Sequence, residues 1–261
     1  METVAPSARS QRTDGHPSFA QREEIPRRAT ACWTVHRPPD DQRPTLKTHP
    51  LRTVRLHLIR HGEVEDGWQR VFGGSRVDMD LSPDGHAQAA MLAEWLAGRK
   101  IDAIFSSPML RVRQTLAPLL ARQPLAPVFL DGLREVDFGD FTGLRWEQVR
   151  ERLGVTAVNW LHVLDHPGLP NGESAAALLD RVRPCVEQIL AAPGCTSAAV
   201  FCHGGIVRAI LAVLMDFSFA KLGHFRMDYG SVTVVDVPLE NPRAAEVGLL
   251  NFSPPAGLRD R

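Results

Sequence analysis

Three short polar clusters in the sequence carry the residue types that phosphate chemistry requires. Arg60, His61 and Gly62 follow an apolar run, Arg111 lies in "SSPMLRVRQT", and His203 lies in "VFCHGG". Arginine binds phosphate oxygens through a planar fork of donors. A histidine with one unprotonated ring nitrogen can attack phosphorus. Each cluster alone is also typical of a solvated strand end or helix surface, but together they predict a phosphoryl-transfer site.

A phosphoryl-transfer site also needs an acid that protonates the departing oxygen. The segment "LREVDFGDFTG" offers three carboxylates, Glu135, Asp137 and Asp140, in a glycine-containing loop. A carboxyl group that donates a proton near neutral pH needs burial or nearby negative charge. A doubly charged phosphate bound beside the loop would supply that charge, so these three residues are the candidate acids.

The polar clusters follow segments that predict β-strands. Residues 54–59, 101–107 and 197–205 are largely apolar runs, typical of strands that are buried on both faces. In open α/β sheets, ligands bind beyond the carboxyl ends of the strands. Each of the three clusters stands at such an end, which favours one shared site. Further short strands are expected at 126–131, 231–237 and 244–252.

Helical patterns alternate with these strands. Ser82 and Pro83 supply an N-cap and a first-turn proline for a helix that ends near residue 98. Ala87, Met91 and Trp95 recur at four-residue steps, with Leu92 and Leu96 beside them, and predict a helix with one buried face. The alternation predicts an α/β fold, a three-layer αβα sandwich with a mostly parallel central sheet. Other helices are expected over 108–122, 145–153, 173–192 and 206–215.

Residues 1–51 differ in composition from the rest of the chain. They are rich in arginine, proline and other polar residues and show no helical or strand periodicity. Such a segment cannot bury enough apolar surface to offset the entropy of ordering it. We therefore expect a disordered N-terminal extension, followed by one domain over residues 52–261. The extension also lacks the basic-then-apolar pattern of a secretory signal.

The composition argues against several classes of protein. Lys and Arg number 30, as do Asp and Glu, and the zero formal net charge argues against a general nucleic-acid or anionic-membrane binder. No apolar run approaches the roughly 20 residues of a membrane span. The four cysteines match neither zinc-site spacing nor a disulfide framework. They are expected to be reduced thiols in a cytoplasmic protein.

Six segments, taken in order, resemble the histidine phosphatase superfamily, the group related to phosphoglycerate mutase. They span about residues 56–211 and read "LIRHGE", "FGGSRVDMDLSPDGHAQA", "IFSSPMLRVRQT", "LREVDFGDFTG", "PNGES" and "VFCHGGIVRAIL". Each segment alone is weak, but their order and spacing are specific. The resemblance implies a phosphoglycerate-mutase-like fold and a reaction through a phosphohistidine.

The resemblance also implies a role for each residue of the polar clusters. His61 matches the nucleophile, Arg60 matches the neighbouring arginine that grips phosphate, and Gly62 permits a tight turn beside them. Arg111 and His203 match residues that bind the phosphate and stabilise its oxygens as charge develops.

Glu135 matches the acid that protonates the leaving oxygen and then activates water. Asp137 and Asp140 are expected to be turn residues, and Arg113 is expected to be structural or peripheral. No metal and no cofactor is implied, because the cationic groups of the site already supply the positive charge that a metal would provide.

The loop that contains Glu135 favours a phosphatase over a mutase, because its sequence "EVDFGDFTG" resembles the phosphatase branch of the superfamily. The expected function is hydrolysis of a small phosphorylated metabolite of sugar-phosphate or alpha-ribazole-phosphate type. A phosphoglycerate mutase and a non-catalytic phosphate-binding member are the alternatives. The expected partner is a small-molecule phosphate ester, with no nucleic acid and no membrane, and a homodimer is left open.

The chain departs from the family pattern directly after the first cluster. Val64 stands where threonine is usual, and Trp68 is displaced from the usual tryptophan position. This stretch therefore indicates phosphate chemistry without indicating the substrate. Substrate specificity is expected to lie in the loops at about residues 160–174 and 217–229.

Overall fold

The structure is a computed structural model that describes residues 52–153, 160–165 and 168–255. The N-terminal extension, including Cys32, lies outside the described residues, so its expected disorder and the domain boundary near residue 52 stay predictions. Cys185, Cys195 and Cys202 are free and buried. In the described part of the chain, no helix is both long and apolar enough to cross a membrane.

The described strands form one six-stranded sheet. They are β1 (Thr53–Arg60), β2 (Ala103–Ser106), β3 (Val128–Phe129), β4 (Ser197–Cys202), β5 (Val232–Pro238) and β6 (Glu246–Phe252). Their order across the sheet is β3-β2-β4-β1-β5-β6. β4 pairs in parallel with β1 and with β2, and β2 pairs in parallel with β3, whereas β5 is antiparallel to β1 and to β6. Three of the five pairings are parallel, which confirms the mostly parallel sheet.

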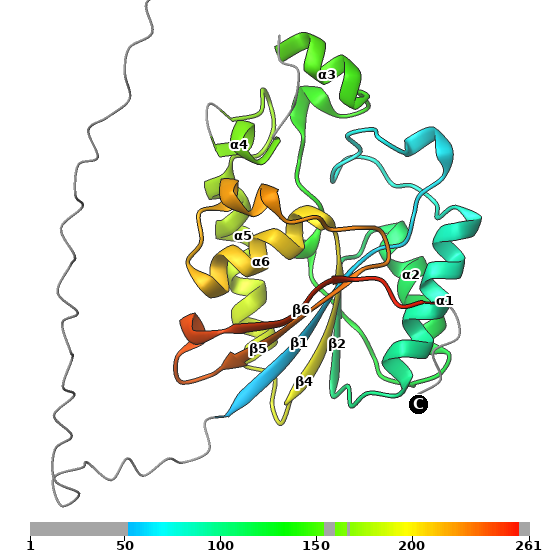
Figure 1. Cartoon of the computed structure of the whole chain (residues 1–261), viewed down its shortest axis with the longest axis vertical. Helices are drawn as coiled ribbons and strands as arrows, with labels where there is room; N and C mark the ends of the chain where they lie inside the picture. The colour runs from blue at the N-terminus through cyan, green and yellow to red at the C-terminus, as the bar shows by residue number, and fades with distance from the viewer. Residues whose placement is uncertain (1–51, 154–159, 166–167, 256–261) are drawn as a thin grey trace, which may run out of the picture. The chain divides into compact units, whose positions relative to one another are not determined.

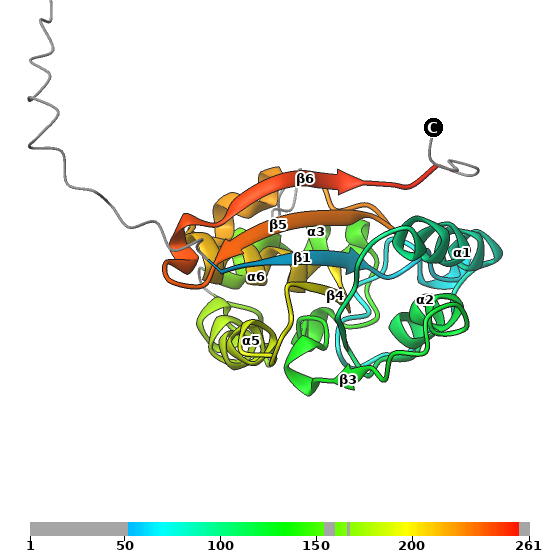
Figure 2. The same cartoon turned by 90° about the horizontal axis from the view of Figure 1, so that it is seen from below.

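The described α-helices cover both faces of the sheet. They are α1 (Pro83–Ala97), α2 (Leu110–Leu120), α3 (Trp146–Leu153), α4 (Trp160–Asp165), α5 (Ala175–Leu190) and α6 (Gly204–Met215). α1 and α2 lie on one face, and α5 and α6 lie on the other (Figure 1 and Figure 2). This arrangement confirms the αβα sandwich. The sequence did not predict α4, a six-residue helix too short to show a clear period.

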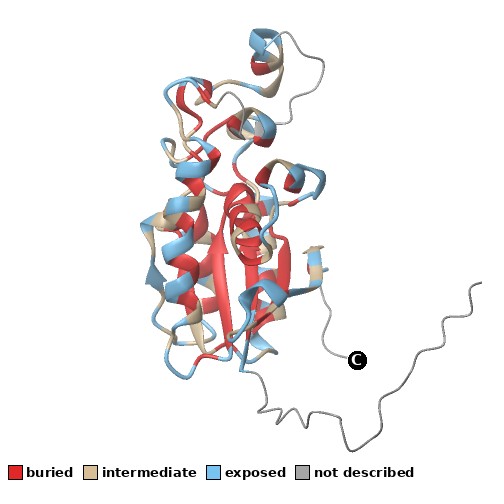
Figure 3. Cartoon of the chain, turned by 90° about the vertical axis from the view of Figure 1, so that its left-hand side faces the viewer, coloured by how far each residue is buried: buried red, intermediate tan, exposed pale blue. Residues whose placement is uncertain are grey.

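Residues 56–59 of β1 are buried on both faces of the sheet, which explains the nearly continuous apolar pattern there. Leu56 and Leu58 pack in the core cluster formed with α5 and α6, and Ile59 packs in the cluster formed with α1 and α2. Figure 3 shows the buried strands enclosed between the helices.

The buried face of α1 matches the predicted one only in part. Leu92 and Leu96 are buried, as expected. Ala87 is exposed, and Met91 and Trp95 are only half-buried. The first turn of α1 lies against the backbone that follows β1, where a Cβ added at Gly85 would lie 2.0 Å from the carbonyl oxygen of Glu63. This close approach decides which side of the helix faces inward. The buried residues are Gly85, Ala89, Leu92, Ala93 and Leu96.

Candidate active site

The parallel strands bring the three polar clusters to the same edge of the sheet. His61 directly follows β1, Ser107 directly follows β2, and His203 directly follows β4, which lies between those two strands. The rings of His61 and His203 meet edge to face, with their centroids 5.2 Å apart. Residues separated by more than a hundred positions in the sequence are therefore neighbours in the fold.

A tight turn carries the chain out of β1. The backbone N–H of Gly62 donates a hydrogen bond of 2.9 Å to Oγ1 of Thr115 on α2. A Cβ added at Gly62 would lie 2.6 Å from the carbonyl oxygen of Gly85. This contact leaves no room for a side chain, so the turn that follows His61 requires glycine.

The hydrogen bonds of His61 fix its protonation and tautomer. Nδ1 lies 2.8 Å from the carbonyl oxygen of Gly62, which can only accept, so Nδ1 carries the proton. Nε of Arg111 donates to Nε2 of His61 at 3.2 Å, so Nε2 is unprotonated. Burial, followed by the charges of Arg111 and Arg60, holds the pKa of His61 well below its ordinary value. The ring is neutral, with a lone pair on Nε2.

Arg111 occupies the first turn of α2 and is almost fully buried. Its other guanidinium nitrogens donate to the carbonyl oxygens of Val77 at 3.1 Å and Gly74 at 3.0 Å. Burial lowers the pKa of Arg111 to about 10, and the charge of Glu135 opposes that shift. The guanidinium therefore stays charged at neutral pH.

Arg113 lies apart from the site. Its guanidinium sits over the ring of Phe129, 4.2 Å from the centroid, and its Nε donates to the carbonyl oxygen of Pro108 at 2.7 Å. It does not line the pocket described below. This placement agrees with the structural role expected for Arg113.

His203 is completely buried behind His61. Its Nε2 lies 2.9 Å from Oγ of Ser107, and its Nδ1 has no hydrogen-bond partner among the described residues. Burial, followed by the charge of Arg111 and then of His61, lowers the pKa of His203 well below its ordinary value. This ring is therefore neutral as well.

Glu135 faces the site from the loop that precedes α3. Its Oε2 accepts a hydrogen bond of 3.3 Å from the N–H of Gly205 at the start of α6, and its Oε1 accepts one of 3.0 Å from the N–H of Val136. Arg181 donates to the carbonyl oxygen of Glu135 at 3.1 Å and pairs with Glu173. The backbone and the carboxylate of Glu135 are both held in place.

The other two candidate acids serve the loop itself. Oδ1 of Asp137 accepts from the N–H of Gly139 at 3.0 Å, and the same carboxylate pairs with Arg76. Asp140 accepts from the side-chain amide of Asn171. Both act as turn residues, as expected, and neither lines the pocket.

Arg60 and Tyr229 form a contact that the sequence did not predict. The guanidinium of Arg60 lies over the ring of Tyr229, 3.9 Å from its centroid, and the ring centroids of Tyr229 and His61 are 5.5 Å apart. Arg60 also donates to the carbonyl oxygen of Met227, and its Nε is buried without a partner among the described residues. Tyr229 is the single tyrosine of the chain. No sequence motif indicated that Tyr229 belongs to the site.

Arg208 is a second site residue that the sequence analysis did not predict. From α6 it donates to the carbonyl oxygens of Leu222 at 3.1 Å, Gly204 at 2.9 Å and Phe225 at 2.7 Å. Burial and the charge of Arg60 lower the pKa of Arg208 to about 10. Three bonds to separate carbonyls tie the start of α6 to the loop that carries Tyr229. Its position in "HGGIVRAIL", directly after the histidine cluster, was the available signal.

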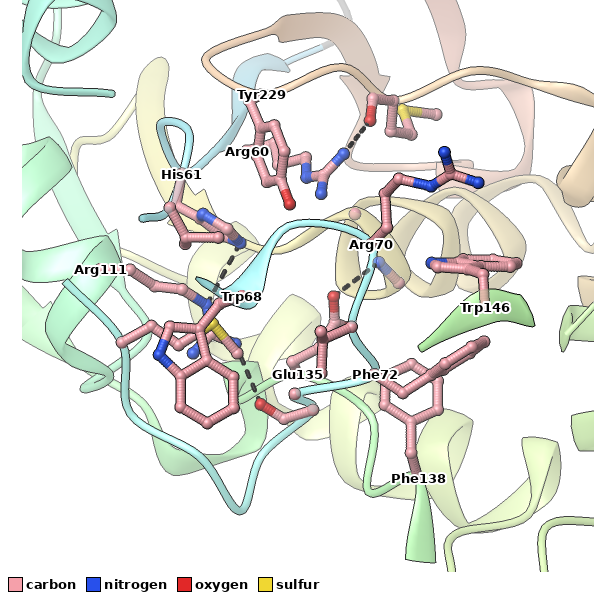
Figure 4. A pocket seen from close by; sticks show the side chains of 18 of the residues that line it. Arg60, His61, Trp68, Arg70, Phe72, Arg111, Glu135, Phe138, Trp146 and Tyr229 are labelled. Carbon is pink, nitrogen blue, oxygen red and sulfur yellow. Dashed lines mark hydrogen bonds between the residues drawn. The ribbon is translucent and has the colours of Figure 1, made fainter. Parts of the chain in front are cut away.

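These residues surround a pocket of about 260 Å³. Figure 4 shows His61 and Arg111 on one side, Arg70 and Trp146 on the other, and Glu135 between them. Of the predicted site residues, His203 and Gly62 lie behind the lining rather than in it. The described lining consists of Arg60, His61, Val64, Trp68, Arg70, Val71, Phe72, Gly73, Gly74, Met79, Arg111, Glu135, Phe138, Trp146, Gly204, Gly205, Arg208, Met227 and Tyr229.

The outer wall of the pocket comes only in part from the loops that were expected to set substrate specificity. Residues 64–74, which begin with the departures from the family pattern at Val64 and Trp68, provide seven of the lining residues. The expected loop at 217–229 contributes Met227 and Tyr229, whereas the described residues of 160–174 contribute none. The physical reason is that the segment after β1 folds back over the carboxyl edge of the sheet and pairs with Arg145 near α3.

In the described part of the chain, no three His, Cys, Asp or Glu side chains are grouped to hold a metal ion. The expectation of a reaction without metal or cofactor stays a prediction. The site contains two neutral histidines, several guanidiniums and one fixed carboxylate. Together these groups are suited to bind and transfer an anionic group.

Fold and site together define an α/β enzyme of the phosphoglycerate-mutase-like type. The family model described as the histidine phosphatase superfamily, branch 1, matches residues 56–249. The chain therefore belongs to the histidine phosphatase superfamily.

Three relatives illustrate this membership. Phosphoserine phosphatase 1 of Hydrogenobacter thermophilus is 29% identical over 184 residues, which cover 70% of this chain and 86% of the relative. An adenosylcobalamin/alpha-ribazole phosphatase of Salmonella typhimurium is 26% identical over 184 residues, covering 70% and 91% of the two chains. The structure of a mycobacterial glucosyl-3-phosphoglycerate phosphatase matches with a TM-score of 0.68 at 26% identity, covering 77% of this chain and 100% of that one.

Proposed function

We propose that this chain hydrolyses small phosphate monoesters through a phosphohistidine formed on Nε2 of His61. The observation that carries the proposal is the tautomer of His61, because its bonds to Gly62 and Arg111 leave a lone pair on Nε2 beside a buried cation. A pocket of about 260 Å³ lies just below the usual size range for drug-sized ligands, which favours a small substrate.

In the first step, the hydrogen bond from Arg111 to Nε2 of His61 breaks, Nε2 attacks phosphorus, and the bond from phosphorus to the ester oxygen breaks. Glu135, which faces the same pocket, donates a proton to that oxygen, and the alcohol leaves. The proton on Nδ1 remains hydrogen-bonded to the carbonyl of Gly62, which disperses the positive charge that develops on the ring.

In the second step, the carboxylate of Glu135 accepts a proton from water while the oxygen attacks phosphorus. The bond from phosphorus to Nε2 breaks, inorganic phosphate forms, and His61 returns to its neutral state. Glu135 is protonated again and ready for the next cycle. The N–H of Gly205 and the N–H of Val136 hold the carboxylate in one orientation for both steps.

Arg60 and Arg111 are the proposed phosphate ligands, because both guanidiniums line the pocket beside His61. His203, which lies behind His61, is proposed to bind the phosphate as well. Its Nδ1 without a described partner and its contact with the ring of His61 support this role. Gly62 is proposed to act through its backbone turn. A structure of the mycobacterial relative holds inorganic phosphate, which supports phosphate binding in this family.

The decisive experiment traps the phosphoenzyme. The protein is mixed with p-nitrophenyl phosphate, quenched in alkali to preserve phosphohistidine, and measured by intact-protein mass spectrometry. We expect one added phosphoryl group that maps to His61. A His61→Ala variant should show neither turnover nor added mass while keeping its circular dichroism spectrum. Turnover in that variant would contradict the phosphohistidine mechanism.

A substrate panel separates the remaining candidate functions. Sugar phosphates and alpha-ribazole phosphate represent the expected classes, and the names of two relatives add phosphoserine and phosphoglycerate esters as candidates. A mutase would convert 3-phosphoglycerate into its positional isomer, whereas a phosphatase releases glycerate and phosphate. A non-catalytic member would bind these compounds without releasing phosphate.

The cellular setting of the activity is proposed from the composition of the chain. We place it in a domain of residues 52–261 in the cytoplasm, which the three free buried thiols support. Light scattering of the purified chain will distinguish a monomer from the homodimer that the sequence left open.

A further inference from the structure

The pocket holds more positive charge than a phosphate group requires. Among its described lining residues, four guanidiniums, of Arg60, Arg70, Arg111 and Arg208, face a single carboxylate, that of Glu135. The carboxyl group of Glu135 is protonated at the start of the proposed reaction, whereas Glu147 pairs with Arg70 at the pocket rim. With Glu147 included, the net charge is therefore three positive charges. A phosphate dianion neutralises two of them, and one positive charge remains to be matched.

Arg70 differs from the other three arginines in its surroundings. Arg60, Arg111 and Arg208 are buried or half-buried and donate to backbone carbonyls. Arg70 is exposed at the rim of the pocket, where it pairs with Glu147 on α3. Figure 4 places it across the pocket from His61, on the side of the departing alcohol in the proposed reaction. Arg70 is therefore the guanidinium best placed to bind a second anionic group, in competition with Glu147.

The backbone of Arg70 is fixed although its side chain is exposed. Arg70 has a φ of 59°, a left-handed conformation that non-glycine residues seldom adopt. Its carbonyl oxygen accepts a hydrogen bond of 3.1 Å from the N–H of Trp146, and the adjacent Val71 forms a β-bridge with Arg145. The ring of Phe72 packs on that of Trp146 with a centroid separation of 4.5 Å. The guanidinium thus extends from a well-supported wall.

The pair between Arg70 and Glu147 does not close this position to a ligand. Both side chains are substantially exposed, at 72% and 42%. Exposed ion pairs of this kind contribute little to stability, because water screens both charges. A substrate anion in the less hydrated pocket can therefore take over one edge of the guanidinium, and Glu147 competes with it.

We propose that Arg70 is a second anion-binding position and that the substrate is a phosphate monoester whose alcohol carries a carboxylate. The proposal rests on the phosphatase function proposed above. A carboxylate supplies the single charge that remains, and its two oxygens match the fork of a guanidinium. A second phosphate would exceed both the remaining charge and the small volume of the pocket.

Matched pairs of esters test this inference. 3-Phosphoglycerate and glycerol 3-phosphate differ only in a carboxylate against a hydroxymethyl group, and phosphoserine and phosphoethanolamine differ only in the carboxylate. In the native protein, we expect kcat/KM to be about tenfold higher for the carboxylate member of each pair, mainly through KM. Arg70→Gln should abolish that preference by raising KM for the carboxylate member of each pair.

Two further variants sharpen the test. Glu147→Gln removes the competing carboxylate and should lower KM for the carboxylate esters alone. Arg243→Gln is the matched control, because Arg243 is an equally exposed, ion-paired arginine that does not line the pocket. It should change nothing. Equal kcat/KM within each native pair, or equal losses for both members in Arg70→Gln, overturns the proposal.

A binding measurement separates this inference from the function on which it rests. Calorimetry with His61→Ala, which should bind both esters without turning them over, should give about tenfold tighter binding of 3-phosphoglycerate than of glycerol 3-phosphate. Adding Arg70→Gln should remove the difference. If the native protein hydrolyses no ester but this difference is present, the proposed function fails and the anion site stands. If hydrolysis is present without the difference, the anion site fails alone.

Discussion

Nε of Arg111 donates a hydrogen bond of 3.2 Å to Nε2 of His61, and both side chains are buried. A permanent cation at this distance keeps the imidazole neutral and points a donor at the place where a phosphate oxygen must lie. One contact therefore links the state of the proposed nucleophile to the binding of the group that it attacks.

Removal of this cation tests both effects. Arg111→Met keeps the apolar stem but loses the charge, and we expect kcat/KM to fall by about a hundredfold to a thousandfold. Since the charge of Arg111 lowers the pKa of His61, that pKa should rise in the variant. The imidazole should then protonate at a higher pH, which can be followed by NMR titration. An unchanged His61 titration would contradict this account of its neutrality.

Glu135→Gln tests the assignment of the acid. The amide can still accept from the N–H of Gly205 but cannot deliver a proton. For phenyl phosphate, a poor leaving group, we expect the first step to slow by about a hundredfold or more. For 2,4-dinitrophenyl phosphate, that step needs no acid, so a burst of dinitrophenol should precede slow turnover. Equal slowing with both esters and no burst would remove Glu135 from this role.

A pair of variants at Tyr229 tests its packing on Arg60. Tyr229→Phe keeps a ring face 3.9 Å from the guanidinium and should retain kcat/KM within about twofold. Tyr229→Leu loses the ring and should reduce kcat/KM by about threefold to tenfold, corresponding to a cation–π contact of ~1 kcal/mol. Similar losses in both variants would instead assign the effect to the hydroxyl group.

His57 gives a prediction about stability that is independent of catalysis. It is 2% exposed, packs on Trp95, and has no hydrogen-bond partner for either ring nitrogen among the described residues. Burial, followed by the charges of Arg55 and Arg99, lowers the pKa of His57 to about 4. The folded protein therefore binds fewer protons at this site than the unfolded chain does between about pH 6.5 and 4.

The free energy of unfolding should therefore fall as the pH is lowered from about 6.5 to about 4. The contribution of His57 to this fall should be up to ~1 kcal/mol per pH unit. His57→Leu removes this part and should reduce the difference between urea midpoints measured at about pH 7.5 and about pH 5. The neutral buried rings of His61 and His203 will keep part of the difference. His86→Gln, at an exposed position, is the control and should leave the difference unchanged.

Much of the fold follows from local patterns. The apolar run at 54–59 predicted β1, because residues 56–59 lie buried between two helical layers. Ser82 and Pro83 predicted the start of α1, and the structure has Ser82 accepting from the N–H of Gly85 as its N-cap. Local chemistry fixes such boundaries, since the capping groups lie within one turn of each other.

The local sequence pattern did not predict contacts in which the backbones of two elements approach each other closely. The four-residue spacing of Ala87, Met91 and Trp95 is a sound helical signal, but it did not show which face is buried. That choice depended on the space available beside Glu63, where only Gly85 fits. Such a contact joins two elements and leaves no trace in the periodicity of either one.

By itself, the sequence determined the strands, the helix starts and the candidates Arg60, His61, Arg111, Glu135 and His203. The tertiary structure alone decided the neutral tautomer of His61, the ring of Tyr229 on Arg60, and the wall that carries Arg70. The physical reason is the range of the interactions. Periodicity and capping act within a few residues, whereas hydrogen-bond partners, burial and pocket charge arise from segments that meet only when the chain packs.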